Sequence, residues 1–212
     1  MAEWKIDRSE VPIRLFKSDF LEFFTHISPV TVVIMWLPIA VYFFVRSFQY
    51  VQAGAFPFFI PLGYFAGIFV WTLAEYTLHR FLFHYPAKSE RAKRVFFLFH
   101  GVHHVQPHIK TRLVMPLVVS IPMALIAYEL FSLIVGTLLR SPAWLPSMFS
   151  GFLTAYLGYD LIHYATHHAH MRRGIFKFLK RYHMQHHYVT PNMRFGVSSP
   201  LWDHVFGTYP AE

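Results

Sequence analysis

Apolar side chains occur along this chain in long unbroken runs rather than at the spacing of one helix face. Four runs stand out, at residues 29–48, 58–78, 114–139 and 144–162. A helix needs about 20 mostly apolar residues to cross the hydrocarbon core of a bilayer. The pattern therefore predicts an all-α membrane protein with four transmembrane helices. The third run is the least regular, because it contains Pro116 and Pro122.

The basic residues predict how these helices are oriented. Residues 1–28 contain four Lys or Arg, the loop at 79–112 contains seven and the tail from residue 163 contains six, whereas the other two connections contain one each. Lys and Arg accumulate in cytoplasmic loops. We therefore expect residues 1–28 to be an amphipathic cytoplasmic segment, with a membrane-embedded domain at 29–212. The long loop and the tail then form a cytoplasmic, histidine-rich helical cap, and both termini are cytoplasmic.

Composition supports this interpretation and excludes several classes of protein. Hydrophobic residues make up 55% of the 212 residues and charged residues only 14%, whereas soluble domains carry about 25% charged residues. The net charge of +8 favours anionic lipid rather than nucleic acid, given the apolar runs. The absence of cysteine excludes disulfides and thiolate metal sites. No short apolar core before a small-residue cleavage site is visible near the N-terminus, so no cleavable signal peptide is predicted.

Histidine carries the candidate chemistry. Fourteen of the 15 histidines lie from residue 79 onward, in the two segments predicted to be cytoplasmic. Ten of them form four motifs, H-x4-H, H-x2-H-H, H-x3-H and a second H-x2-H-H. These ten are His79, His84, His100, His103, His104, His163, His167, His183, His186 and His187.

The spacing of these motifs indicates two metal ions. Residues three or four apart share one face of a helix, so each motif with that spacing can direct two imidazoles to one ion. Adjacent residues diverge by about 100°, so a His-His pair can serve two neighbouring ions. The five-residue step from His79 to His84 does not fit a regular helix and predicts a distorted turn at the membrane exit. Ten imidazoles are too many for one ion, and they suit zinc, copper, iron or nickel.

Three carboxylates lie close in sequence to these motifs. Metal-bound histidines usually donate their other ring N–H to a carboxylate or a carbonyl. Glu75 precedes His79 by four residues and Asp160 precedes His163 by three, while Asp203 lies in the W-D-H-V-F-G-T segment. We therefore expect Glu75, Asp160 and Asp203 to support the metal ligands.

With these residues the chain resembles the fatty acid 2-hydroxylases, within the fatty acid hydroxylase and sterol desaturase superfamily. The resemblance covers residues 75 to 208. It is carried by E-Y-T-L-H-R-F-L-F-H (75–84), H-G-V-H-H (100–104), R-L-V-M-P (112–116), G-Y-D-L-I-H-Y-A-T-H (158–167), Y-H-M-Q-H-H-Y (182–188) and F-G-V-S-S-P-L-W-D-H-V-F-G-T (195–208). The histidine spacings alone indicate only the superfamily, and the words flanking them indicate the 2-hydroxylase branch.

The resemblance implies that the ten histidines ligate two metal ions, with iron expected for activity and zinc possible in a purified protein. It also implies that a membrane lipid places carbon 2 of its acyl chain beside the metals, where O2 and two electrons convert C–H into C–OH. No catalytic side chain beyond the metal ligands is expected. Arg112, with Lys110, is the candidate partner of the lipid head group. The chain departs from the family in having Ile109 where an acidic residue is usual, which leaves the head group open.

The electron donor and the cellular location are also expectations. Eukaryotic members often carry an N-terminal cytochrome b5 domain, and about 28 residues before the first run are too few for one. We therefore expect a separate electron carrier, either cytochrome b5-like or a ferredoxin. The membrane is expected to be a bacterial inner membrane, or the endoplasmic reticulum in a eukaryote.

Several alternative functions share these residues. A lipid desaturase, a sterol oxidase or a carotenoid hydroxylase would use the same histidines, because the pose of the substrate decides the outcome. From other classes, a metal transporter would use the histidines as carrier ligands, and a lipid-binding protein could keep the fold without catalysis. A transporter would need polar residues inside the spans, and the apolar runs offer few.

Overall fold

Helices form all the regular structure that the computed structural model describes, over residues 5–210. Six elements precede residue 100: α1 (Asp19–Phe23), α2 (Pro29–Gln52), α3 (Phe59–Thr77), η1 (Leu78–Phe83), α4 (Glu90–Phe96) and η2 (Phe97–Gly101). The others are α5 (Val102–Val105), η3 (Lys110–Arg112), α6 (Leu117–Phe131), η4 (Ser132–Leu138), α7 (Trp144–His168), α8 (Gly174–Tyr188) and α9 (Leu201–Val205). The all-α class predicted from the sequence is confirmed for these residues.

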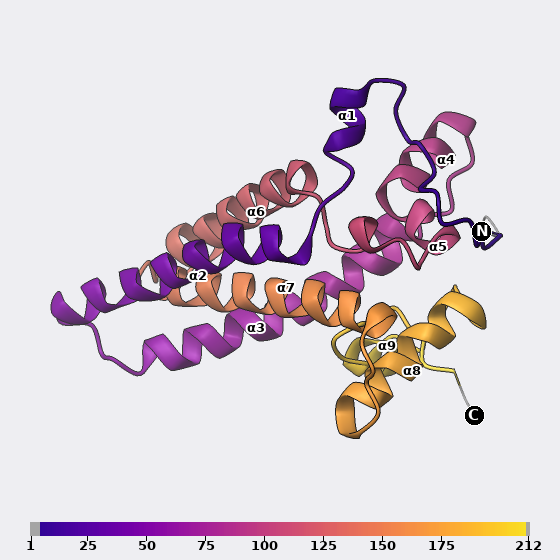
Figure 1. The fold of residues 1–212 in the computed structure, drawn as a ribbon. Helices are drawn as coiled ribbons and strands as arrows, with labels where there is room; N and C mark the ends of the chain where they lie inside the picture. The colour runs from indigo at the N-terminus through magenta and orange to yellow at the C-terminus, as the bar shows by residue number, and fades with distance from the viewer. Residues whose placement is uncertain (1–4, 211–212) are drawn as a thin grey trace.

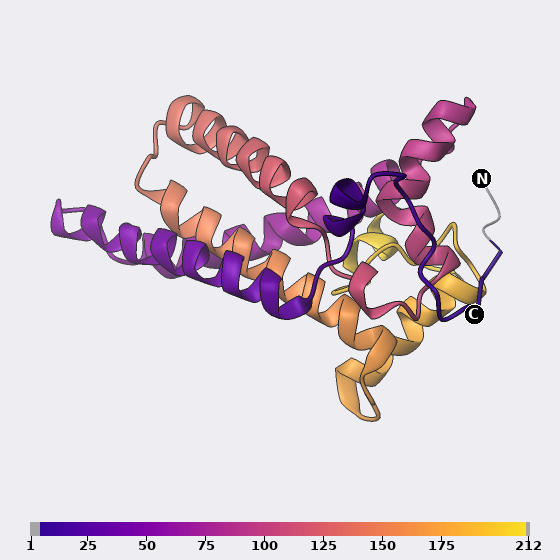
Figure 2. The same cartoon turned by 45° about the horizontal axis from the view of Figure 1, so that its top comes forward.

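The four long helices α2, α3, α6 and α7 run side by side, and α1, α4, α5, α8 and α9 gather at one end of them (Figures 1 and 2). We call α4, η2 and α5 together with α8 and α9 the cap. Local sequence sets where elements begin: the Ser28 hydroxyl accepts the backbone N–H of Thr31 at 3.1 Å, and Pro29 follows it at the first position of α2. A serine N-cap followed by proline is a strong helix start.

Three segments are long and apolar enough to cross a membrane: Pro29–Gln52, Phe59–Phe83 and Lys110–Leu138. They coincide with the first three predicted spans, extended by a few residues. The fourth predicted span lies in α7, which is equally long but is not apolar enough to qualify by the same measure. Helix α7 is less apolar because it packs against α2 and α3, so that many of its side chains are buried within the protein, including small polar ones such as Ser147 and Ser150.

Aromatic side chains form the core around α7. The Tyr156 ring lies 5.2 Å from the Trp71 ring of α3 and 5.7 Å from the Trp36 ring of α2, centroid to centroid. The Ser150 hydroxyl donates a 2.8 Å hydrogen bond to the Ala40 carbonyl of α2. These contacts place α7 inside the bundle.

Small residues let α3 and α7 approach at backbone distance. On α3, Gly63 faces the Ser147 side chain of α7, and Gly67, four residues later, faces the Met148 carbonyl. A Cβ atom added at Gly151 would lie 1.9 Å from the carbonyl oxygen of Tyr64. Paired small residues at this spacing are how membrane helices pack closely. The close crossing fixes the end of α3, where the first histidine motif begins.

Candidate metal centre

The first histidine motif lies on a π-helical turn. Helix α3 passes directly into η1, and the His84 N–H donates to the His79 carbonyl at 3.1 Å, a five-residue step. The wider π-turn brings residues five apart over one another, and such turns are frequent at functional sites. The distorted turn predicted for H-x4-H is therefore confirmed, and it points both imidazoles to the same place.

The motif histidines gather in two groups in space, and each H-x2-H-H motif contributes two histidines to one group and one histidine to the other. From the first motif, His100 and His104 belong to one group and His103 to the other. From the second motif, His183 and His187 belong to the second group and His186 to the first. This division follows from the angle between adjacent residues on a helix.

Ten histidines thus form two groups of five, and these are the same ten that the motifs singled out. In each group the nearest ring nitrogens all lie within 4.8 Å of one another. Group A comprises His79, His84, His100, His104 and His186, and group B comprises His103, His163, His167, His183 and His187. Nine of the ten are buried, and His167 is half-buried.

Hydrogen bonding alone does not explain how these rings converge. The Nε2 atom of His183 lies 3.0 Å from Nε2 of His167 and 3.1 Å from Nε2 of His187. The Nε2 atom of His103 likewise has two Nε2 neighbours, each at 3.0 Å. A neutral ring nitrogen is either one donor or one acceptor, so it cannot bond two others. Nitrogens that ligate one shared ion would converge in this way without hydrogen bonds between them.

Electrostatics keep the cap histidines in the state that metals bind. Burial, reinforced by the neighbouring histidines, lowers the pKa of seven of them below the ordinary value of 6.5. The seven are His84, His100, His103, His104, His183, His186 and His187. Their rings are therefore neutral near pH 7, and neutral imidazole is the form that ligates metal. The donor set fits two ions.

Backbone carbonyls accept the outer ring N–H groups of two histidines of group A. The Nδ1 atom of His79 bonds the Phe195 carbonyl, and that of His186 bonds the Met193 carbonyl at 2.7 Å. Carbonyls in this role fix the tautomer so that Nε2 is free for a metal. Phe195 and Met193 could not be identified from sequence, because a backbone carbonyl leaves no residue-type signal.

The three carboxylates are buried, but they accept hydrogen bonds from groups other than the ten histidines. Asp203 accepts the backbone N–H groups of Phe195 and Gly196, both at 2.8 Å. Glu75 accepts the N–H groups of residues 197 and 198 at 2.6 and 2.8 Å. Asp160 accepts the N–H of Met115 at 3.1 Å. None of these bonds joins a carboxylate to one of the ten histidines, and support of the ligands by Glu75, Asp160 and Asp203 stays a prediction. Asp203 and Glu75 hold residues 195–198, whose first carbonyl bonds His79.

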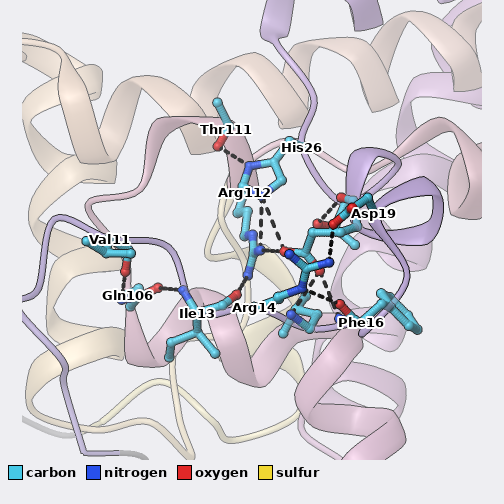
Figure 3. A network of polar contacts seen from close by, with 12 residues as sticks. Val11, Ile13, Arg14, Phe16, Asp19, His26, Gln106, Thr111 and Arg112 are labelled. Atoms are coloured by element: carbon cyan, nitrogen blue, oxygen red, sulfur yellow. Dashed lines mark hydrogen bonds and ion pairs between the residues drawn. The ribbon is translucent and has the colours of Figure 1, made fainter.

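Arg112 borders a pocket that His100, His103 and His163 also border, and its contact with a lipid head group stays a prediction. Its guanidinium bonds the Glu22 carboxylate and the Ile13 carbonyl, and lies 3.0 Å from Nε2 of His26 (Figure 3). Its side chain is only 3% exposed. The charge expected to bind a head group is therefore already paired within the protein. Glu22 and Gln106, which hold this region together, carried no signal in the sequence.

Two cavities reach the metal centre from different sides. An apolar pocket of about 340 Å³ is bordered by His100, His103 and His163. A more polar pocket of about 850 Å³ is bordered by His84, His104 and His187, and by Lys5 and Lys93. A third cavity of about 640 Å³ lies among α3, α6 and α7 and is lined almost entirely by apolar side chains. Met115 borders both this cavity and the first pocket.

Comparison with protein families now decides the assignment. The model of the fatty acid hydroxylase family matches residues 64–208, which include all ten histidines. The chain belongs to the fatty acid hydroxylase family. The resemblance drawn from the motifs is confirmed, and family membership makes this protein an oxidoreductase whose two histidine groups fit a di-metal site.

Characterised relatives are similar over most of the chain. The dihydroceramide fatty acyl 2-hydroxylase FAH2 of Arabidopsis thaliana is 41% identical over 93% of this chain and 80% of its own length. The ceramide very long chain fatty acid hydroxylase SCS7 of Saccharomyces cerevisiae is 38% identical over 90% of this chain and 48% of its own. Human fatty acid 2-hydroxylase is 32% identical over 99% of this chain and 60% of its own.

A solved structure shares the fold. The structure described as full-length scs7p with only the hydroxylase domain visible superposes with a TM-score of 0.81 at 36% identity. The superposed region covers 91% of this chain and 70% of the chain in the solved structure. The arrangement of helices and cap is therefore that of an experimentally determined member of the family.

Proposed function

We propose that this protein inserts one oxygen atom at carbon 2 of a fatty acyl chain, in a reaction that uses O2, two electrons and two metal ions. One oxygen atom enters the C–H bond and the other leaves as water, which consumes two electrons and two protons. The observation that carries the proposal is the convergence of two five-histidine groups beside an apolar pocket. The relatives named as 2-hydroxylases support carbon 2 as the position.

The ten histidines would hold the two ions, one in each group. When bound, iron supplies the reduction of O2 that oxidation of an unactivated C–H bond requires. The protein supplies a neutral ligand set, because burial keeps the cap imidazoles unprotonated. The Phe195 and Met193 carbonyls orient a ring of group A each. No other side chain is needed to transfer a proton to or from carbon.

The pocket beside His100, His103 and His163 would hold the reacting part of the substrate. Its walls are mostly apolar, so they favour an acyl chain and exclude water. Because Met115 borders both this pocket and the cavity among α3, α6 and α7, the rest of the chain can continue toward the membrane-facing helices. We propose a membrane lipid, as free acid or amide-linked, as the substrate.

Topology and electron supply complete the proposal. We propose that α7 crosses the membrane together with the three apolar segments, so that both termini and the cap share the cytoplasmic side. The domain division at residue 28 fits this topology, since α2 begins at Pro29. A separate electron carrier, cytochrome b5-like or a ferredoxin, would approach the cap at the polar pocket, where Lys5 and Lys93 lie beside His84, His104 and His187.

Lipid mass spectrometry of expressing cells tests the function. The wild type should produce acyl chains heavier by one oxygen, placed at carbon 2 by fragmentation. His103→Ala and His186→Ala, one from each group, should lose this product. His170→Ala is the matched control, because His170 is exposed and lies outside both groups. Loss of two hydrogens, or oxidation of a sterol or carotenoid, would keep the enzyme class and refute carbon-2 hydroxylation.

A further inference from the structure

The segment that precedes the first long helix is tied down along its length. We call residues 5–27 the strap. Near its start the Asp7 N–H donates to the Val105 carbonyl at 2.8 Å, and at its end the Ile27 N–H donates to the Thr111 carbonyl at 2.9 Å. Residues 105–111 directly follow His103 and His104. The strap is therefore anchored to the same stretch of chain that carries three members of the histidine groups.

One side chain from that stretch forms a clamp on the strap. Gln106 is 1% exposed. Its amide oxygen accepts the Ile13 N–H at 2.8 Å, and its amide nitrogen lies 3.0 Å from the Val11 carbonyl (Figure 3). The same nitrogen lies 2.8 Å from an Asp7 carboxylate oxygen and 3.1 Å from the Ser9 hydroxyl. These part-buried hydrogen bonds join residues more than 90 apart in sequence and fix the path of the strap, because their loss would leave polar atoms of the buried Gln106 amide unpaired.

A second clamp shapes the part of the strap nearest the metal centre. Glu22 in α1 accepts the N–H groups of Leu15 and Phe16 at 2.9 and 2.8 Å, and also pairs with Arg112. Burial raises the pKa of Glu22, but these N–H groups and the Arg112 charge outweigh it and keep the pKa below its usual range. The ionised carboxylate therefore holds residues 15 and 16 against α1.

The clamped segment forms part of the pocket beside the metal centre. Leu15, Phe16, Leu21, Phe24 and Thr25 all border the cavity that His100, His103 and His163 also border. Four of these five strap residues are apolar. The strap thus lines the same cavity as residues that belong to groups A and B.

We propose that five strap residues, Leu15, Phe16, Leu21, Phe24 and Thr25, form a substrate-binding wall of the active site, which contacts the acyl chain near the reacting carbon and selects among acyl chains by size. The proposal rests on the proposed function for the nature of the ligand. The clamps make the wall rigid, and a rigid wall discriminates because a larger group must displace fixed side chains.

Helix α1 offers matched positions for a test. Phe24 borders the pocket, whereas its neighbour Phe23 does not and is 72% exposed. Leu21 borders the pocket, whereas its neighbour Phe20 does not and is 70% exposed. Since the chain has no cysteine, a cysteine introduced at any of these positions is the single thiol in the protein.

The experiment compares labelling of Phe24→Cys and Phe23→Cys by a maleimide in the purified metal-loaded protein, without reductant, with and without palmitate. At a palmitate concentration about ten times its Kd, labelling of Phe24→Cys should slow about tenfold, and labelling of Phe23→Cys should not change. Leu21→Cys and Phe20→Cys repeat the comparison if the first pair folds poorly. Equal rates with and without palmitate at Phe24, or equal protection at both positions of a pair, would overturn the proposal.

A second readout is selectivity during turnover. Phe24→Ala should change the ratio of kcat/KM between a short and a long acyl chain by about tenfold relative to wild type, and Phe23→Ala should leave the ratio unchanged. If the wild type is active and both variants keep its kcat/KM ratio between the short and the long acyl chain, the strap is not a substrate-binding wall. Protection of Phe24→Cys by palmitate, together with no hydroxylated product from the wild type, would refute the proposed function instead.

Discussion

Replacing Asp203 by asparagine tests how residues 195–198 support the metal centre. Asp203 is fully buried, and its two carboxylate oxygens accept the N–H groups of Phe195 and Gly196 and the Thr208 hydroxyl, at 2.7–2.8 Å. In the better of its two orientations, an asparagine keeps one oxygen for Phe195 and Thr208. Its amide nitrogen then faces the Gly196 N–H, so two buried donors oppose each other.

The magnitude follows from these contacts. One hydrogen bond to a charged acceptor is worth about 1.5–3 kcal/mol, and an unpaired buried donor costs about 1–3 kcal/mol more. We therefore expect a loss of roughly 3 kcal/mol in unfolding free energy, which lowers Tm by about 6–12 °C for a protein of this size. Because the Phe195 carbonyl orients His79, metal affinity should also fall by about 10–100-fold.

Thermal unfolding and metal release to a chelator, both in detergent, measure these two effects. Asp19→Asn is the matched control, because Asp19 has a 93% exposed side chain and pairs only with the exposed Arg14; such pairs contribute little. If Asp203→Asn melted and released metal like the wild type, the reasoning about residues 195–198 would be wrong.

Three further predictions use other parts of the structure. Gly151→Ala should destabilise the protein by at least about 1–3 kcal/mol, because the added methyl group forces α3 and α7 apart. Gly158→Ala meets no atom within 4 Å among the described residues, so it should gain up to about 1 kcal/mol from helix propensity. Equal melting temperatures of the two variants would contradict this prediction. His183→Ala should reduce bound metal from about two ions per chain to about one, measured by elemental analysis, and an unchanged content would contradict the division into two groups. Burial lowers the pKa of histidines such as His103 and His187, so the folded metal-free protein binds fewer protons than the unfolded chain. As the pH decreases below about 6.5, the free energy of unfolding should decrease by up to about 1.4 kcal/mol per pH unit for each such histidine. A constant Tm from about pH 8 to about pH 5 would count against neutral buried rings.

The sequence predicted the features that depend on local periodicity. Apolar runs predicted three membrane-long segments to within a few residues, because burial in lipid requires an unbroken apolar stretch. Helical geometry predicted that each His-His pair would divide between two ions, and the structure places His103 and His104 in different groups. The five-residue step from His79 to His84 predicted the distorted turn, which is the π-turn η1.

Features that depend on contacts distant in sequence could not be predicted in the same way. Glu75 precedes His79 by one turn, yet its hydrogen-bond partners lie more than 120 residues away, at Val197 and Ser198. The clamp formed by Gln106 depends on the path of a strap whose residues show no regular pattern. The fourth span had an apolar run, but α7 packs inside the bundle, where small polar residues such as Ser150 are satisfied by helix contacts.

The most direct test of the account follows the oxygen atom. The purified protein, loaded with iron and supplied with a reducing partner and an acyl lipid, is exposed to isotope-labelled O2, and the product is fragmented in a mass spectrometer. The account predicts one labelled oxygen atom at carbon 2, formed only when both histidine groups are intact. Label at another carbon, oxygen derived from water, or equal product from the His103→Ala variant would contradict it.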